Sequence, residues 1–273
     1  MKGRGLRGHL ALTAAVAADG RTFIREQSFS APIHLSKPHL DEDVLVVNVA
    51  NPTAGLFAGD RIRYDITVES GARMLLTAPS ASRAHRIVEG DARVEQEFRV
   101  AKGAWLECWP EMFIPQGGAR YRQKTVARVE EGGELLLIEM IAPGRTASGE
   151  VFAFAELVWE TEVWLGEGKI ARERYTLTPE SPTLAALRAR FPEAYYASCF
   201  VVSPELRADA ECWRRIHDLH HDEAWVGCSA LVRGGFAIRV LAAGSIALRK
   251  IIAQVRREIY TARDRREPAL RRN

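Results

Sequence analysis

"RIRYDITVESGARMLLT", residues 61–77, combines a strand, a glycine turn and a second strand, and the chain repeats this pattern twice. Apolar residues occupy every second position from Ile62 to Val68, which is the period of a half-buried strand. The later copies are "ARVEQEFRVAKGAWLECW" at 92–109 and "QKTVARVEEGGELLLIEM" at 123–140. We interpret each copy as one step, similar to a β-hairpin, of a repeated β structure.

The spacing of the glycine turns indicates how these steps assemble. A valine precedes the turn glycine by three residues in every copy, and the pairs are Val68 and Gly71, Val100 and Gly103, and Val129 and Gly132. Turns that recur about every thirty residues are typical of stacked repeat architectures. Because one hairpin cannot bury its own apolar face, the steps must stack. The sequence therefore predicts a mainly β fold, a helical roll or stack of β-hairpins.

The last third of the chain changes to helical signals. After a further predicted hairpin at 151–177, Ser181 and Ser203 each precede a proline, the arrangement of an N-cap and a first helical residue. Residues 228–244 indicate strand, and an apolar stripe then predicts a helix from Ser245. The stripe consists of Ile246, Leu248, Ile251, Ile252, Val255 and Ile259. We therefore predict a few α-helices in the C-terminal third.

These elements are expected to form a single domain over residues 1–262. A β-roll covers about 1–178, a part with helices covers about 179–262, and residues 263–273 form a basic, mobile tail. The net charge is +3, but the C-terminal helix and tail carry an excess of arginine, so the rest of the chain is close to neutral. A neutral body argues against nucleic acid as a partner.

Composition places the chain among cytoplasmic globular proteins. With 47% hydrophobic and 27% charged residues, it has no apolar stretch long enough to span a bilayer, so no membrane partner is expected. The N-terminal run resembles a signal peptide, but it holds few large apolar residues and a hairpin turn is expected at 19–20. The four cysteines lie far apart and indicate reduced thiols; they are Cys108, Cys199, Cys212 and Cys228.

The glycine-rich loop at 51–59 is a candidate phosphate-binding loop, but its context argues against that function. Such a loop must open onto a helix, whose free N–H groups and dipole face the anion. Here the loop opens onto the alternating strand at 61–68. We therefore interpret it as a turn that leads into the β structure.

His217 and His221 are candidate metal ligands, because a spacing of four residues places two side chains on one helical face. Cys212 and Asp222 stand nearby in the sequence. Asp218 occupies the position where a metalloprotease has glutamate, and the chain contains no serine nucleophile elbow. A metal-dependent hydrolase is therefore an alternative function, and the simpler interpretation is a solvated helix end.

Three acidic residues are expected to be buried. Glu107 and Glu139 stand in apolar runs, and Asp60 shares the parity of the apolar side of its strand. A buried carboxylate without compensation costs several kcal/mol, so each needs a partner, water or a passing cation. The simplest partner is an arginine, either Arg120 or Arg145.

Four segments, taken in order, resemble the motifs of one protein family. They are "NPTAGLFAGDRIRYDITVESGARMLLTAPSASRAHR" at 51–86, "GAWLECWPEMFIPQGGARYRQ" at 103–123, "APGRTASGEVFAF" at 142–154 and "IRVLAAGSIALRKII" at 238–252. On these segments the chain resembles the urease accessory protein family UreD, called UreH in some organisms. The resemblance extends from about residue 20 to residue 262.

The resemblance implies a maturation factor and not an enzyme. Members of this family dock on apo-urease, recruit UreF and through it the GTPase UreG, and help to deliver nickel to the carbamylated lysine of the urease active site. The family fold is a helical roll of many strands with a few helices, which agrees with the repeat analysis. No tightly bound cofactor is expected, and nickel would pass through transiently.

For such a passage, Asp60, Glu139 and Glu150 are our candidate residues of a transient nickel path. Asp60 lies at the glycine loop, Glu139 interrupts an apolar strand, and Glu150 ends a segment of small residues that leaves room for solvent. Single carboxylates would attract a divalent cation yet hold it loosely, which suits transfer. A purely structural scaffold with no role toward metal is a further alternative.

Overall fold

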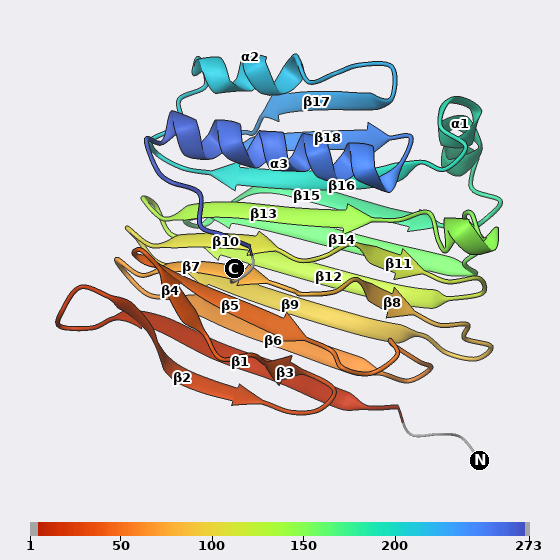
Figure 1. Ribbon diagram of the computed structural model, residues 1–273, viewed down its shortest axis with the longest axis horizontal. Coiled ribbons are helices and arrows are strands. Elements are labelled where there is room, and N and C mark those ends of the chain that lie inside the picture. Colours follow the sequence, from red (N-terminus) through yellow and green to blue (C-terminus); the bar gives the residue numbers. More distant parts are fainter. Residues whose placement is uncertain (1–4, 271–273) are drawn as a thin grey trace.

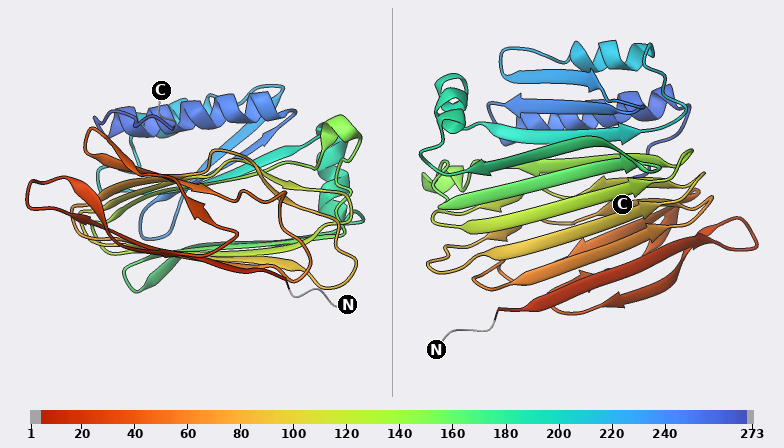
Figure 2. Two further views of the ribbon diagram at one scale, coloured as in Figure 1. Left: turned by 60° about the horizontal axis from the view of Figure 1, so that its bottom comes forward. Right: turned by 180° about the vertical axis from the view of Figure 1, so that it is seen from behind.

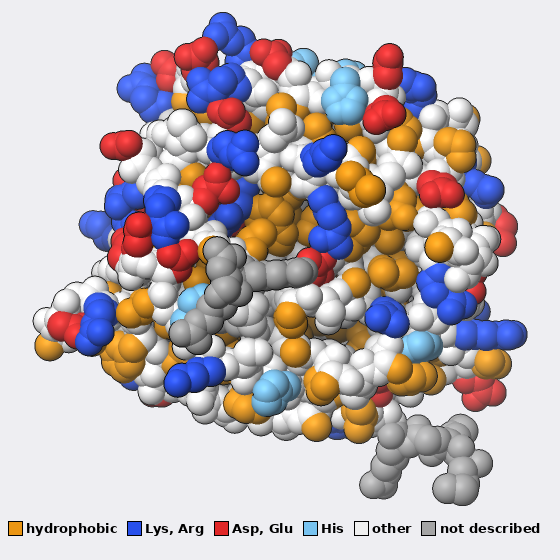
Figure 3. All heavy atoms as spheres, viewed as in Figure 1, with side chains coloured by type: hydrophobic (Ala, Val, Ile, Leu, Met, Phe, Trp, Pro, Cys, Tyr) orange, Lys and Arg blue, Asp and Glu red, His pale blue; other side chains and the backbone are white. Residues whose placement is uncertain are grey.

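The computed structural model describes residues 5–270, which form two β-sheets packed face to face. Helix α3 lies on the outer side of the larger sheet (Figures 1 and 2). On the face that carries α3, basic and acidic side chains are interspersed and neither sign dominates (Figure 3). Residues 1–4 and 271–273 lie outside the described residues, and with them the start of the predicted signal-like run and the last part of the predicted tail.

The smaller sheet has seven strands in the order β15-β14-β12-β9-β6-β1-β2. Its strands are β1 (Arg7–Val16), β2 (Thr22–Phe29), β6 (Arg61–Val68), β9 (Ala92–Val100), β12 (Arg120–Val129), β14 (Glu156–Leu165) and β15 (Gly168–Leu177).

The larger sheet has eleven strands, eight of them in the order β17-β18-β16-β13-β10-β7-β5-β3. Of the three short strands outside this order, β4 pairs with β5, β11 pairs with β13, and β8 pairs with β11. The strands are β3 (His34–Leu35), β4 (His39–Asp41), β5 (Val44–Ala50), β7 (Arg73–Thr77), β8 (Ser82–Ala84), β10 (Trp105–Trp109), β11 (Phe113–Pro115), β13 (Glu134–Ile141), β16 (Tyr195–Val202), β17 (Ala224–Ala230) and β18 (Phe236–Ala242).

The central strands form parallel coils in which the chain alternates between the two sheets. Strands β6, β9, β12 and β14 pair in parallel in the smaller sheet, as do β5, β7, β10 and β13 in the larger one. The valines predicted to be equivalent are in register, since Val68 pairs with Val100 and Val100 with Val129. The mainly β roll predicted from the sequence is confirmed.

The repeat unit differs from the prediction in one detail. The sequence predicts hairpin-like units, but the two strands of each unit lie in different sheets. Gly71, Gly103 and Gly132 have φ values of 77°, 73° and 86° and form the corners that carry the chain across. Corner and hairpin turn use the same residue type, so the local pattern does not distinguish them. Each strand instead pairs with the equivalent strand of the next unit.

Antiparallel pairs close the roll at both ends. Strands β1 and β2 form the hairpin predicted from the turn at 19–20, and β14 and β15 form the hairpin predicted at 151–177. In the larger sheet β16, β18 and β17 are also antiparallel to their neighbours. The roll therefore has parallel coils only in its middle.

Three α-helices occur in the described part of the C-terminal third, together with a 3-10 helix, η1 (Thr146–Ser148), before it. They are α1 (Pro182–Arg190), α2 (Glu211–His217) and α3 (Ser245–Ala262). Helix α1 follows Ser181 as predicted. Helix α2 begins later than predicted, because the Ser203 hydroxyl donates to Glu134 Oε2 at 2.5 Å instead of capping a helix. None of these described helices is long and apolar enough to cross a bilayer.

Two hydrophobic cores result from this layering. One lies between the sheets, and the other lies between the larger sheet and the helices α2 and α3. Five residues of the predicted α3 stripe are buried in the second core, namely Leu248, Ile251, Ile252, Val255 and Ile259, whereas Ile246 is 70% exposed. Helix α3 therefore serves as a lid over the outer face of the larger sheet.

An ion pair anchors α3 to the sheet. Glu107 on β10 is fully buried and receives hydrogen bonds from Arg256 Nε at 2.5 Å, Arg256 Nη2 at 3.0 Å and the Tyr260 hydroxyl at 2.6 Å. The predicted partners, Arg120 and Arg145, are therefore wrong for this acid. Glu107 points to the outer face of the larger sheet, where α3 supplies the cation.

The described part of the C-terminal tail, residues 263–270, contacts the body of the protein. Arg263 is buried, pairs with Glu134 Oε2 at 2.9 Å and lies over the Trp105 ring. Asp41 accepts hydrogen bonds from the Arg266 side chain and the Ala269 backbone N–H. The arginines that indicate a solvated tail in the sequence thus form ion pairs with carboxylates on the body of the protein.

Candidate functional site

A cavity of about 170 Å³ lies between the two sheets and reaches the buried Glu139. Its mouth is formed by the loop after β5 and the loop before β8, including Asn51, Gly55 and Ser80. Its inner wall carries polar and aromatic side chains from β6, β9, β12, β13 and β14. These are Tyr64, Gln96, Tyr121, Gln123, Glu139 and Trp159. The cavity is thus a polar inlet into an otherwise apolar core.

Glu139 is held by hydroxyl and amide donors. Its Oε1 accepts from Gln123 Nε2 at 3.1 Å and from Thr125 Oγ1 at 3.0 Å, and its Oε2 accepts from Thr161 Oγ1 at 2.7 Å and Ser198 Oγ at 3.5 Å. The residue is only 4% exposed, and among residues 5–270 no cation pairs with it. Burial raises the pKa of this carboxyl above its ordinary value of 4.5, and the hydroxyl donors oppose the rise only in part.

This raised pKa predicts a pH-dependent effect of Glu139→Gln. A carboxyl whose folded pKa exceeds its unfolded pKa favours the folded state at low pH, and this contribution is lost as pH rises through the folded pKa. Glu139→Gln lacks this pH-dependent contribution to stability. Its free energy of unfolding relative to the natural protein should therefore increase as the pH rises above the ordinary carboxyl pKa of 4.5. Urea titrations of both proteins across this range measure the difference, and a difference that is flat or decreases with pH contradicts the assignment.

A second acid, which is half-buried, lies beyond Glu139 toward the β15 edge. Glu173 on β15 accepts from the Tyr196 hydroxyl at 2.5 Å and from Arg239 Nε at 2.8 Å. Its negative charge contributes to the raised pKa of Glu139. Polar groups therefore continue through the core from the cavity toward the β15 edge of the molecule.

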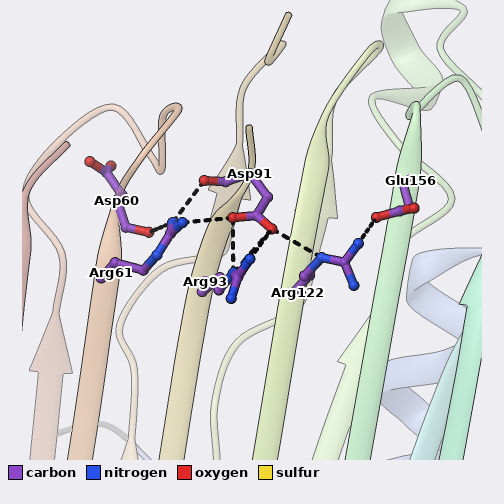
Figure 4. Close-up of polar contacts among 6 residues, drawn as sticks. All are labelled: Asp60, Arg61, Asp91, Arg93, Arg122 and Glu156. Carbon is purple, nitrogen blue, oxygen red and sulfur yellow. Dashed lines mark hydrogen bonds and ion pairs between the residues drawn. The ribbon is translucent and has the colours of Figure 1, made fainter. Parts of the chain in front are cut away.

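Asp60 is buried, as predicted, but it binds the backbone at the rim and does not line the cavity. Its Oδ1 accepts from the Leu6 N–H and its Oδ2 from the Phe57 N–H, both at 2.8 Å. In Figure 4 its carboxylate points away from Arg61, which donates to the backbone oxygens of Asp60 and Asp91. Asp60 thus fixes the glycine-rich loop whose residues form the cavity mouth.

A row of alternating charges extends from this loop across the smaller sheet. Asp91 pairs with Arg61, Arg93 and Arg122 at 2.9–3.0 Å, and Arg122 reaches Glu156 (Figure 4). The row ties β6, β9, β12 and β14 together at the end of the coils where the mouth lies. It is a structural brace for the rim.

Glu150 lies outside the cavity lining and has a cationic partner. Its Oε2 accepts from Arg145 Nε and from the Gly117 N–H, each at 2.9 Å. The Arg145 guanidinium and this backbone donor lower the pKa of the carboxyl to about 2. The structure therefore does not bring Asp60, Glu139 and Glu150 together, because only Glu139 lines the cavity.

The two candidate histidines do not share a helical face, so that prediction is wrong. Helix α2 ends at His217, and His221 lies in the following turn, where its Nδ1 accepts from the Glu223 N–H at 3.2 Å. Within residues 5–270, no three His, Cys, Asp or Glu side chains group in a way that could hold a metal ion. The helix ends early because the chain turns back to form β17.

Several polar residues of the site were not predicted from the sequence. They are Gln123, Thr125, Thr161, Ser198 and Glu173, which stand on inward-facing positions of four different strands. The available signal was parity, because each shares a strand face with buried apolar residues. Their convergence on one interior line depends on strand pairing across the molecule, which no local pattern specifies.

Comparison with known proteins gives a consistent result. Residues 6–272 match the family model described as UreD urease accessory protein. A urease accessory protein UreD from Opitutus terrae is 42% identical over 252 residues, which cover 91% of this chain and 92% of the relative. A protein of the same name from Acetivibrio thermocellus is 29% identical over 252 residues, covering 90% and 95%. The match spans both sheets and α3, and the chain therefore belongs to the UreD urease accessory protein family.

Proposed function

We propose that the protein is a cytoplasmic urease maturation factor, which binds apo-urease and recruits UreF and, through UreF, the GTPase UreG for nickel insertion. The observation that carries this proposal is the family match over residues 6–272. The relatives' name links them to urease, and a mainly β scaffold with a helical cover offers large surfaces for protein partners. The protein would act by binding and would have no catalytic turnover of its own.

We further propose that nickel passes through the interior as cargo. Glu139 supports this route, because it is a buried carboxylate at the inner end of a cavity and has no cationic partner among the described residues. The oxygen atoms next to it belong to the hydroxyl groups of Thr125, Thr161 and Ser198, and oxygen ligands suit a hard, hydrated divalent cation. A single carboxylate would hold such an ion loosely. The next acid, Glu173, is already paired with Arg239.

Asp60 and Glu150 have different roles in this proposal. Asp60 acts as a positioning residue, since it fixes the loop at the cavity mouth through the Leu6 and Phe57 backbone. Glu150 is neutralised by Arg145, so it is the weakest candidate ligand of the three. The nickel route therefore rests on Glu139.

Omission of this chain from cells that co-express urease, UreF and UreG should leave urease assembled but poor in nickel and inactive. Restoring the chain should restore the nickel content, measured by mass spectrometry of purified urease. The purified chain alone should hydrolyse neither urea nor GTP, because it lacks a phosphate loop and a nucleophile with a base at recognisable spacing. Steady turnover by the chain alone, or full nickel loading without it, contradicts the proposal.

A further inference from the structure

An apolar groove of about 540 Å³ lies where the larger sheet extends beyond the smaller one. The smaller sheet ends at β15, whereas the larger continues through β18 to β17, as Figure 2 shows from behind. Helix α1 closes one end of the groove with Leu184 and Leu187. Leu241 and Trp225 form its floor, and Trp225 is 41% exposed. The inner face of β17 and β18 thus lacks the cover that other strands of this sheet have.

Strand β15 borders this groove with a free edge. Among the described strands it pairs only with β14, so its other side presents unpaired backbone donors and acceptors. Its side chains alternate, with Tyr175 and Leu177 toward the groove and Arg172 and Arg174 toward solvent. An added strand would therefore gain a backbone ladder on one side and, beside Tyr175 and Leu177, an apolar pocket for every second side chain. Further along this face of β15, Glu173 is paired with Arg239.

The charges beside this edge select the chemistry of the added strand. Three cations of β15 share two carboxylates of β14: Lys169 pairs with Glu162, and Arg172 and Arg174 both reach Glu160. The last turn of α1 adds Arg188, whereas Arg190 in the same turn already lies 3.9 Å from Asp222 and over the Trp225 ring. The solvent side of the edge is thus short of negative charge, and acidic residues placed opposite these cations would be favourable.

The same charges disfavour a second copy of this chain as the occupant. In an antiparallel pair of β15 edges centred on residues 172–174, arginine would lie directly opposite arginine. Like charges directly opposite each other destabilise strand pairing. These charges therefore disfavour pairing of β15 with the β15 edge of a second copy and favour a strand of opposite charge.

We propose that this groove binds an extended segment of a partner protein that adds as a strand to β15, with apolar side chains facing the groove and acidic side chains facing solvent. This inference is independent of the nickel route, because neither Glu139 nor the cavity takes part. The backbone ladder would supply affinity, and the alternation of apolar and acidic residues would supply specificity.

A fluorescent peptide of about ten residues that alternates valine and glutamate tests the proposal with the full-length protein. Fluorescence anisotropy should show saturable binding. Replacing glutamate by lysine in the peptide, or N-methylating the amides that face β15, should weaken binding by about tenfold or more. Hydrogen exchange should slow at the β15 amides when the peptide is bound and remain unchanged at β2, the opposite edge of the sheet.

Paired variants of the protein complete the test. Arg172→Gln with Arg174→Gln should weaken binding several-fold, whereas Arg25→Gln, an exposed arginine on β2, should not. Trp225→Ala should also weaken it, and Phe23→Ala on β2 is the matched control, because Phe23 is 40% exposed. Equal binding of the lysine or N-methylated peptide, protection at an edge other than β15, or uptake of an apolar dye with no peptide binding would each overturn the proposal.

Discussion

Arg256→Ala should lower the free energy of unfolding by about 3–5 kcal/mol, as expected when one partner of a buried ion pair is removed. The substitution leaves the fully buried Glu107 without its cation and leaves only the Tyr260 hydroxyl as a donor to it. It also removes the hydrogen bond from Arg256 to the Pro268 carbonyl oxygen, which helps to hold the tail. Urea denaturation followed by circular dichroism measures the loss.

Arg257→Ala is the matched control, because Arg257, the neighbour of Arg256 on α3, is 69% exposed and pairs with Glu267 at 3.6 Å. Surface ion pairs of this kind contribute about 0–1 kcal/mol. A combined Glu107→Leu and Arg256→Met variant should recover most of the stability, because it removes both buried charges. If Arg256→Ala costs no more than Arg257→Ala, the buried pair does not anchor α3.

Glu139→Ala should reduce the nickel content of co-expressed urease by about tenfold or more, the order of effect seen when a group that supports a metal is removed. Glu139→Gln should have a similar effect, although it retains the shape and one acceptor, because it removes the charge that attracts the cation. Asp60→Ala should also lower loading, through displacement of the loop at the cavity mouth. Nickel analysis of purified urease is the measurement.

Glu150→Ala is the control for this experiment, since it removes a carboxylate outside the cavity lining. Every variant should still capture UreF, which separates a failure of nickel transfer from a failure of assembly. Full nickel loading with both Glu139 variants would show that the ion travels elsewhere. The protein would then act as a scaffold alone.

The roll could be predicted from the sequence because its signal is local. The valine and glycine spacing around Gly71, Gly103 and Gly132 repeats a complete structural unit, and in-register stacking follows from it. The switch from hairpin to sheet-crossing corner was not predictable, because both use a glycine with positive φ. What distinguishes them is the partner of each strand, which lies about thirty residues away.

The site was less predictable because its contacts join distant residues. The acidic character of Glu139 inside an apolar run was visible, but its donors come from β12, β14 and β16. Glu107 pairs with Arg256, which lies 149 residues later in the chain. Ser203 illustrates the reverse case, in which a strong local signal for a helix start is overridden by a hydrogen bond to Glu134.

The stacking of the coils separates the parts of the inlet that can vary from those that cannot. Inserting one residue into β6, β9 or β12 would turn every later side chain of that strand to the opposite face, so the inner wall with Gln96 and Gln123 tolerates no change in length. The mouth is built from connections outside these ladders, at 51–59 and 78–81. The mouth loops can therefore change in length or charge during evolution while the inner wall of the cavity stays fixed. The mouth and the inner wall can adapt to different partners independently.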